Sequence, residues 1–278
     1  MHWGIAAVNL REAEADLFVD HDSTDQGYVL ESVAPSGEAS ISRIRSHVAF
    51  SDWSVNRDAA ENLLALASVK MVTITVTESG YYSDPDGNLD LTHKTVADEI
   101  EGGVARSVYA YLAAALDCRR TRIGAPITLC CCDNIRQNGK MLRRNFTDYL
   151  TATGQTALNA WVQTNVTFPC SMVDRITPRS TPALSQEMSA ITGITEPHPV
   201  MAEAFRQWVL EDDFATEMPD LAAVGVTVTN DVDPYEETKI RVLNGGHTCL
   251  AYLAALRGIE TFDQAMQTPE LFRALLEL

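Results

Sequence analysis

The sequence lacks the segments by which membrane and exported proteins are recognised. No apolar stretch approaches the roughly 20 residues that a helix needs to span a bilayer. The chain begins MHWGI, with no basic region ahead of an apolar run, so no secretory signal is visible. We therefore expect a protein that is neither embedded in a membrane nor exported by such a signal.

Positive charge is also scarce. The 278 residues include 21 Lys and Arg against 38 Asp and Glu, which gives a formal net charge of −17, and the basic residues form no dense run. Because a nucleic-acid partner requires a basic face, we expect no such partner and favour a small molecule or another protein. The hydrophobic content of 46% is enough for a sizeable globular core.

The cysteines are not spaced as an extracellular disulfide framework. Three of the six are consecutive, at Cys130, Cys131 and Cys132, and adjacent residues of a strand point to opposite faces. This usage fits a reducing compartment, so we expect a cytoplasmic protein. The cysteines also lack the pattern of a zinc site, and no bound metal is expected.

What the sequence does contain is an alternation of helical and apolar strand-like segments. Helix formers at 58–67 run into the β-branched segment 69–77, and a helix within 98–118 precedes the apolar strand 125–132. This alternation, continued by a helical and then an extended segment at 140–162 and 164–173, predicts a parallel α/β sheet.

Shorter segments complete the expected organisation. Strands are predicted at 3–10 and 28–33, and 38–46 is predicted to pair with the second as an antiparallel excursion. Ser, Thr and Pro become frequent at 178–200, which predicts a connection, and we place the boundary between domains 1–198 and 199–278 there. The second domain has a short strand predicted at 222–228 and is mostly helical from residue 236.

Polar residues follow two of the predicted strands. TVTESGYY (75–82) places a polar cluster and a glycine at a strand end, where open α/β sheets bind ligands, although ordinary turns have similar residues. CDNIRQNG (132–139) offers two carboxamides, Asn134 and Asn138, whose NH2 groups can donate to an oxyanion. The alternative is an Asx-turn with a helix N-cap, which turn statistics favour.

Asp174 and Arg175 lie side by side in PCSMVDRITP (169–178). Such a dipeptide is most often a solvated surface pair. The apolar flanks favour burial here, and with it a role in structure or in a site.

The segment 233–248 carries the most chemical information. If it is helical from about Tyr235, Asn244 and His247 share a face, and Lys239 lies within roughly 140° of Asn244 at 100° per residue. Burial by the apolar neighbours Ile240, Val242, Leu243 and Leu250 would suit the lysine to general-base work. A surface lysine and a core histidine remain the alternative.

Two adjacent glycines, Gly245 and Gly246, favour the site. Inside a helix each costs roughly 1 kcal/mol relative to alanine. The close approach of a ligand or of another backbone would explain them.

Taken together, these segments resemble the mannitol dehydrogenase family of polyol-specific long-chain dehydrogenases. The resemblance rests on six motifs in order, which cover essentially the whole chain: WGIAAVNLR (3–11), TVTESGYY (75–82), CDNIRQNG (132–139), MVDRITP (172–178), QWVLEDDF (207–214) and KIRVLNGGH (239–247). It implies a Rossmann-like nucleotide domain, a mostly helical substrate domain, and hydride transfer between a secondary alcohol and NAD without zinc.

The resemblance also implies roles for individual residues. Lys239 would be the general base, Asn244 and an earlier amide, Asn134 rather than Asn138, would bind the developing alkoxide, and His247 would orient the substrate. The remaining positions would line the substrate pocket or contact the cofactor. The substrate positions are Asp174, Arg175, Glu236 and Asn138, and the cofactor positions are Asn9, Thr77, Glu78, Gly80 and Asn134.

The sequence departs from the family in three places. No glycine-rich phosphate turn precedes Trp3, the chain stops within a predicted helix at 269–278, and Asn9-Leu-Arg11 stands where an acidic residue would read an NAD ribose. We therefore expect a Rossmann-like domain without its first strand and glycine-rich turn, followed by the start of the helical domain, with NAD as cofactor and the preference over NADP open.

The substrate remains a choice among sugar alcohols and sugar acids. Residues 28–38 and 234–241 look most like members that act on D-arabinitol, which predicts its oxidation to D-xylulose. Oxidation of mannitol or reduction of a hexuronate is the alternative. A hypothesis of another class is an inactive, truncated remnant that survives as a binding protein.

Overall fold

The predicted alternation of helix and apolar strand builds a parallel sheet. The computed structural model describes residues 3–15 and 27–276, and its central sheet has the order β5–β6–β7, with every strand parallel to its neighbour. All five residues of β6 are buried, as expected of a strand covered on both faces. The three strands are β5 (Met71–Ile74), β6 (Ile127–Cys131) and β7 (Val166–Thr167).

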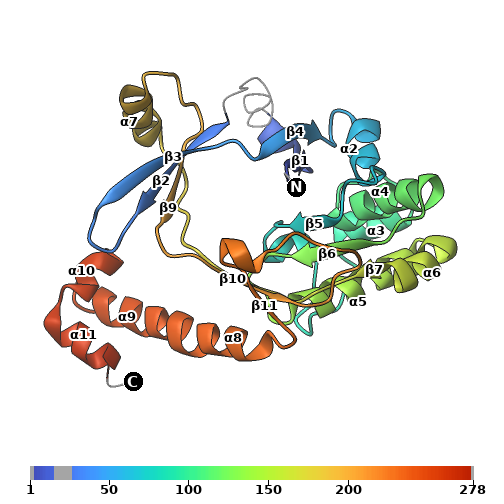
Figure 1. Ribbon diagram of the computed structural model, residues 1–278. Helices are drawn as coiled ribbons and strands as arrows, with labels where there is room; N and C mark the ends of the chain where they lie inside the picture. The colour runs from blue at the N-terminus through green and yellow to red at the C-terminus, as the bar shows by residue number, and fades with distance from the viewer. Residues whose placement is uncertain (1–2, 16–26, 277–278) are drawn as a thin grey trace. The chain divides into compact units, whose positions relative to one another are not determined.

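Helices gather around this sheet (Figure 1). The central one, α4, has nine buried residues and packs against α2, α5 and α6. The helices are α2 (Arg57–Leu64), α3 (Lys94–Ile100), α4 (Val108–Arg122), α5 (Asn138–Ala152) and α6 (Thr156–Asn165).

The helix predicted within 98–118 is α4, which α3 precedes, and the helical segment predicted at 140–162 is split into α5 and α6. Between α3 and α4, Ser107 caps the new helix by accepting the Ala110 N–H, and its own N–H is accepted by Glu99. Between α5 and α6, Gly154 adopts a φ of +69°, which ends a helix. Caps and left-handed residues override the helical pattern at these points.

A second parallel pair lies at the start of the chain, where a strand was predicted. β1 (Ile5–Asn9) pairs with β4 (His47–Asp52), and Asn9 stands opposite Asp52 at the end of both strands. Trp53, which follows β4, is 1% exposed and belongs to the apolar core of the central sheet. The pair is thereby joined to that core.

The predicted antiparallel excursion is confirmed. β2 (Tyr28–Val33) and β3 (Ala39–Ile44) form a hairpin, and β9 (Val200–Glu203) adds a parallel strand to β2. The segment expected to be a connection contains a helix, α7 (Pro182–Thr192), which Thr181 caps and Pro182 begins. We missed this helix because its Ser, Thr and Pro residues, read as loop formers, are also N-terminal helix signals.

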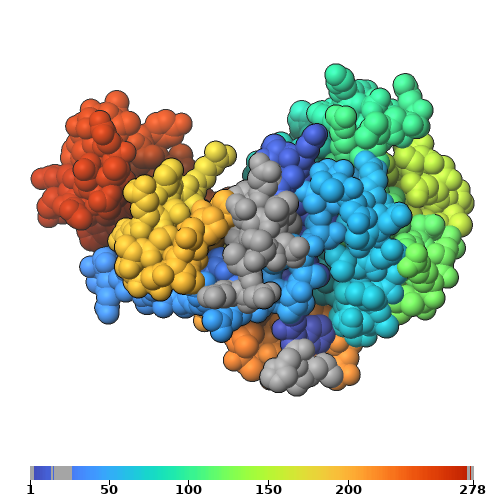
Figure 2. Space-filling view, turned by 90° about the horizontal axis from the view of Figure 1, so that it is seen from above, coloured from blue at the N-terminus to red at the C-terminus, as the bar shows by residue number. Residues whose placement is uncertain are grey.

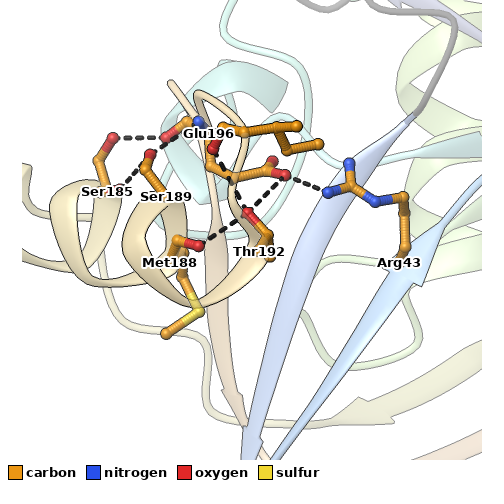
Figure 3. Close-up of polar contacts among 7 residues, drawn as sticks. Arg43, Ser185, Met188, Ser189, Thr192 and Glu196 are labelled. Carbon is orange, nitrogen blue, oxygen red and sulfur yellow. Dashed lines mark hydrogen bonds and ion pairs between the residues drawn. The ribbon is translucent and has the colours of Figure 1, made fainter.

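Helix α7 packs on the hairpin (Figure 2) through Leu184 and Met188, which contact Val29 and Met201. Glu196 reinforces this packing with a side chain that is 5% exposed (Figure 3). Its carboxylate pairs with Arg43 of β3, and its backbone N–H donates to Ser189 Oγ at 2.9 Å. The helix and the hairpin are thus held by both apolar and charged contacts.

The chain forms two compact units, Met1–Asn230 (unit 1) and Asp231–Leu278 (unit 2). This boundary lies later than the one expected after residue 198, because β9 pairs with β2, and β10 pairs with both β8 and β11. Of the predicted strand at 222–228, the first half is a turn. The strands are β8 (Ser171–Asp174), β10 (Gln207–Glu211) and β11 (Thr227–Thr229), and short 3-10 turns occupy Glu12–Glu14, Glu78–Tyr81 and Ala222–Val224.

Unit 2 is helical, as predicted, and has a small core. Leu250 and Ala254 of α9 pack there with Ala265 and Leu271. No helix in the described part of the chain is long and apolar enough to cross a membrane. The elements of unit 2 are α8 (Asp233–Thr238), a π-helical turn η4 (Lys239–Asn244), α9 (Gly245–Ala255), α10 (Phe262–Met266) and α11 (Pro269–Leu276).

Candidate functional site

Backbone strain marks the turn that follows β5. Thr77 has φ 62° and ψ 164°, a combination that is essentially confined to glycine and costs on the order of 1–3 kcal/mol. Tyr82 and Gln137 also have positive φ values, and these are the three non-glycine residues with that property in the described ranges. All three follow β5 or β6. Such strain clusters at ligand sites, so this carboxyl edge of the sheet is a candidate site.

Within the turn, the predicted cofactor residues have different surroundings. Thr77 and Glu78 are exposed and accessible to a ligand. A Cβ on Gly80 would lie 2.9 Å from the Cβ of Val76, so the turn itself requires this glycine. The geometry of the turn is enough to explain why glycine is found at position 80, and cofactor binding by Gly80 stays a prediction.

A buried carboxylate ties this turn to the next strand. Asp133, 8% exposed, follows β6 and accepts the N–H groups of Val76 at 2.8 Å and Thr77 at 3.1 Å, and it also accepts the Tyr81 hydroxyl at 2.7 Å. Sequence reasoning missed this residue, since attention fell on the amides beside it. The available signal was an acidic residue placed directly after a fully apolar strand.

The two amides of CDNIRQNG have opposite environments. Asn134 is exposed, whereas Asn138 is fully buried. Asn138 Nδ2 donates to the carbonyls of Cys131, Asp133 and Ser171 at 2.9–3.1 Å, and its Oδ1 accepts the Ser171 N–H. Its polar atoms join the ends of β6 and β8, so the structure gives Asn138 a structural role, and substrate binding by Asn138 stays a prediction.

Asn9 is a second predicted contact residue whose role is structural. Its side chain is 4% exposed, and Nδ2 donates to the Arg11 carbonyl at 2.8 Å and to Asp52 Oδ2 at 2.7 Å. Oδ1 accepts the Arg11 N–H at 3.0 Å. Both amide hydrogens are used within this loop, which Asn9 shapes, and a cofactor contact by Asn9 stays a prediction.

The strand-end regions hold two groups with shifted pKa values. Ser54 and Asn9 donate to Asp52, and these hydrogen bonds outweigh its partial desolvation and lower the pKa of the carboxyl. Burial raises the pKa of Tyr82.

The two residues of the Asp-Arg dipeptide at the end of β8 also have different surroundings. Arg175 Nε donates to the Glu203 carbonyl at 3.0 Å, and its guanidinium donates to Ser32 Oγ at 3.2 Å. Arg175 thus joins β8 to β9 and β2, which is the structural alternative to substrate binding. Asp174 is half-buried and stands opposite Gln207 in β10.

In unit 2, a π-helical turn sharpens the predicted convergence of Lys239, Asn244 and His247. The Gly245 N–H donates to the Ile240 carbonyl, five residues earlier, where an α-helix would use the residue four earlier. The wider turn brings Lys239 and Asn244, five apart, closer to one face than the 140° expected. Asn244 and His247 remain three apart on the α-helical side. Single π turns inside α-helices are frequently found at functional sites.

The surroundings of these residues are only partly as expected. Lys239, Asn244 and His247 are half-buried, and Glu236, one turn earlier, is 6% exposed. The His247 ring meets the Phe262 ring edge-on, with centroids 4.4 Å apart. These contacts limit the orientations that the imidazole can take.

The predicted burial of this helix by its apolar neighbours is wrong. Ile240 is 42% exposed, Val242 70% and Leu243 39%, and Leu250 alone of the four is buried. The unit core forms on the Leu250 side of α9. At Gly245, the nearest described atom to an added Cβ is the Ile240 carbonyl oxygen at 3.6 Å, which is an ordinary contact. No close protein backbone explains that glycine.

The cysteines are all free, and the predicted alternation of the consecutive three is confirmed. Cys131 Sγ lies 3.0 Å from the Tyr81 hydroxyl, whereas Cys130 and Cys132 face the other side with their sulfurs 3.7 Å apart. The hydrogen bond between these two thiols lowers the pKa of Cys132 and raises that of Cys130. In residues 3–15 and 27–276, no three His, Cys, Asp or Glu side chains gather as a metal site would require.

Known proteins match both units. Residues 1–223 match the family model of the mannitol dehydrogenase Rossmann domain, and residues 231–278 match that of the mannitol dehydrogenase C-terminal domain, which confirms the predicted fold class. The chain is 39% identical over 272 residues to a D-arabinitol 4-dehydrogenase of Ralstonia nicotianae, covering 98% of this chain and 58% of that protein.

Two solved structures are also similar. A crystal structure of D-sorbitol dehydrogenase in substrate-free form superposes with a TM-score of 0.89 at 33% identity, over 99% of this chain and 57% of the other. The ternary complex of Pseudomonas fluorescens mannitol 2-dehydrogenase with NAD and D-mannitol gives 0.87 at 30% identity, over 98% and 56%. The chain thus spans less than two thirds of the length of each of these relatives.

Proposed function

Because the chain belongs to the mannitol dehydrogenase family, we propose that the protein carrying it oxidises a sugar alcohol to a ketose with NAD, and that the substrate is D-arabinitol, which yields D-xylulose. The observation that carries the proposal is the face of unit 2 on which a π turn gathers Lys239, Asn244 and His247. A base, a hydrogen-bond donor and an orienting ring are the groups that alcohol oxidation requires.

The turn after β5 fits a dinucleotide. Thr77 and Glu78 are exposed at the carboxyl end of a parallel strand, where open α/β sheets bind nucleotides, and the strain at Thr77 is of the kind found at ligand sites. We assign cofactor contacts to Thr77, Glu78 and Asn134. When bound, NAD supplies the acceptor for the hydride.

The residues of unit 2 carry the proton chemistry of the proposal. The ε-amino group of Lys239, in its neutral form, takes the hydroxyl proton as the adjacent carbon loses its hydride. The amide NH2 of Asn244 donates to the oxygen on which negative charge develops, and a donor there favours the transition state over the ground state. His247, held edge-on by Phe262, orients the substrate. Glu236 is the proposed entry of the proton path, and Lys239 is one turn away from it.

From unit 1, we propose that Asn134 donates to the substrate oxygen and that Asp174 lines the substrate pocket. Both are at strand ends, and Asn134 has an exposed amide.

The choice of D-arabinitol rests on sequence similarity to the Ralstonia enzyme. Mannitol is the first alternative, because the Pseudomonas structure holds it. A hexuronate is the second alternative, because its reduction is the same hydride transfer in the reverse direction.

We expect an assay with a panel of polyols and both nicotinamide cofactors to show turnover of D-arabinitol with NAD and formation of D-xylulose. The measurement is NADH absorbance, with the product identified by chromatography. Turnover of mannitol without turnover of D-arabinitol would reject the substrate, and turnover with NADP alone would reject the cofactor. Absence of NADH binding by the chain in a fluorescence titration would contradict the whole proposal and favour a non-catalytic chain.

We further expect chelators to leave this activity unchanged, since Lys239 and the amides perform the roles that a zinc ion would otherwise have. The comparison is the rate before and after dialysis against EDTA, with a zinc-dependent alcohol dehydrogenase treated in parallel. Loss of activity that zinc restores would mean that a metal takes part.

A further inference from the structure

Asp133 and Thr77 form a unit that the catalytic proposal does not use. Thr77 has a backbone conformation that a β-branched residue adopts only when its surroundings impose it. The imposing contacts are two hydrogen bonds in which Val76 and Thr77 donate consecutive N–H groups to the two oxygens of Asp133. Hydrogen bonds to an ionised acceptor are stronger than neutral ones.

Tyr81 completes the arrangement from the far side of the turn. It is 0% exposed, and its hydroxyl donates to the same Asp133 oxygen that accepts the Val76 N–H. Burial raises the pKa of Tyr81, so its hydroxyl keeps its proton and remains a donor. The Tyr81 carbonyl in turn accepts the Tyr109 hydroxyl at 3.0 Å. The turn is thus fixed from β6 and from helix α4.

The consequence lies at the exposed side of the turn. Thr77 and Glu78 are exposed, while the groups that fix them, Asp133 and Tyr81, are buried. If Asp133 stopped accepting the Thr77 N–H, Thr77 would relax to a negative φ and the exposed residues would move with it. The strained turn is held in advance of binding, and such preorganisation increases affinity.

We propose that Asp133 is a positioning residue for the dinucleotide: it holds Thr77 in a conformation otherwise reserved for glycine and so presents the 77–78 turn to the cofactor. This inference rests on the proposed function, because it presumes a nicotinamide nucleotide at this edge. It predicts that glycine at position 77, which adopts a positive φ without strain, makes the carboxylate less necessary.

The test is NADH fluorescence titration of the full chain and four variants. We expect Asp133→Asn to raise the Kd about tenfold, since each 1.4 kcal/mol of lost preorganisation is a factor of ten. Thr77→Gly alone measures what the loss of the threonine side chain costs in affinity, and in its background Asp133→Asn should raise the Kd by no more than about threefold. A smaller effect of the same substitution in the glycine background separates positioning from general loss of structure.

The fourth variant, Tyr81→Phe, is the control for stability. It removes a buried hydrogen bond but leaves both amide bonds to Asp133, so we expect a lower melting temperature and a smaller rise in the Kd than Asp133→Asn causes. An unchanged Kd in Asp133→Asn, or an equal effect of Asp133→Asn with threonine and with glycine at position 77, would overturn the inference alone. Failure of the wild-type chain to bind NADH would overturn both the inference and the proposed function.

Discussion

Replacement of Lys239 by alanine is expected to lower polyol turnover by about 10²–10⁴-fold, the usual contribution of a general base. The loss follows because no other group is proposed to take the hydroxyl proton from the substrate. NADH affinity should stay within about twofold, since the proposed cofactor contacts lie in unit 1. The measurements are steady-state kcat and an NADH titration, made on any form of the protein that oxidises polyols.

Arg241→Ala provides a matched control two residues away. Arg241 is an exposed cation that pairs with Glu237 at 2.5 Å on the same helix, so its removal changes the charge of this segment without touching the proposed base. We expect wild-type turnover from Arg241→Ala. Small primary amines should partly restore the turnover of Lys239→Ala. A wild-type kcat in Lys239→Ala would show that another group takes the proton.

Replacement of Asn138 by alanine is expected to lower the free energy of unfolding by about 3–5 kcal/mol, because several buried polar groups lose a partner at once. The Ser171 N–H would lose its acceptor and the Ser171 carbonyl a donor, while the Asp133 carbonyl would keep only the Ile135 N–H. Each unsatisfied buried group costs about 1–3 kcal/mol. Urea unfolding followed by circular dichroism measures the change.

Asn134→Ala is the control from the same motif. Asn134 is exposed, so we expect its unfolding free energy to stay within about 0.5 kcal/mol of the wild type. The proposed donor role predicts that this variant loses turnover all the same. Equal stability of the two variants would refute the structural assignment of Asn138, and equal turnover of Asn134→Ala and the wild type would remove Asn134 from the site.

The pair Asn134 and Asn138 also shows why site prediction from sequence was incomplete. Both amides follow the same buried strand, four residues apart, and nothing in the residue type separates them. Which of the two is exposed depends on β8, more than 30 residues further along, because the Ser171 N–H of that strand donates to Asn138. Asn9, Gly80 and Arg175 likewise have structural contacts that the sequence did not reveal. Asn9 donates to the Asp52 side chain, Gly80 lies against the Val76 side chain, and Arg175 donates to the Glu203 carbonyl.

Asp133 illustrates the opposite error. It belongs to a motif that the sequence analysis singled out for its two amides, and nothing in the motif indicated that the carboxylate accepts backbone N–H groups. Its partners, Val76 and Thr77, are more than 50 residues earlier, and only the parallel pairing of β5 and β6 brings the two strand ends together.

The sequence by itself determined the elements whose signals are local: the apolar strands β5 and β6, the helices around them, the β2–β3 hairpin and the helical segment that carries Lys239, Asn244 and His247. Its six ordered motifs also pointed to the family. The packing of distant segments determines which polar side chains are exposed and which hold the backbone, and where the first unit ends. The physical reason is that a buried hydrogen-bonding group must find a partner, and the partner is supplied by segments distant in the chain.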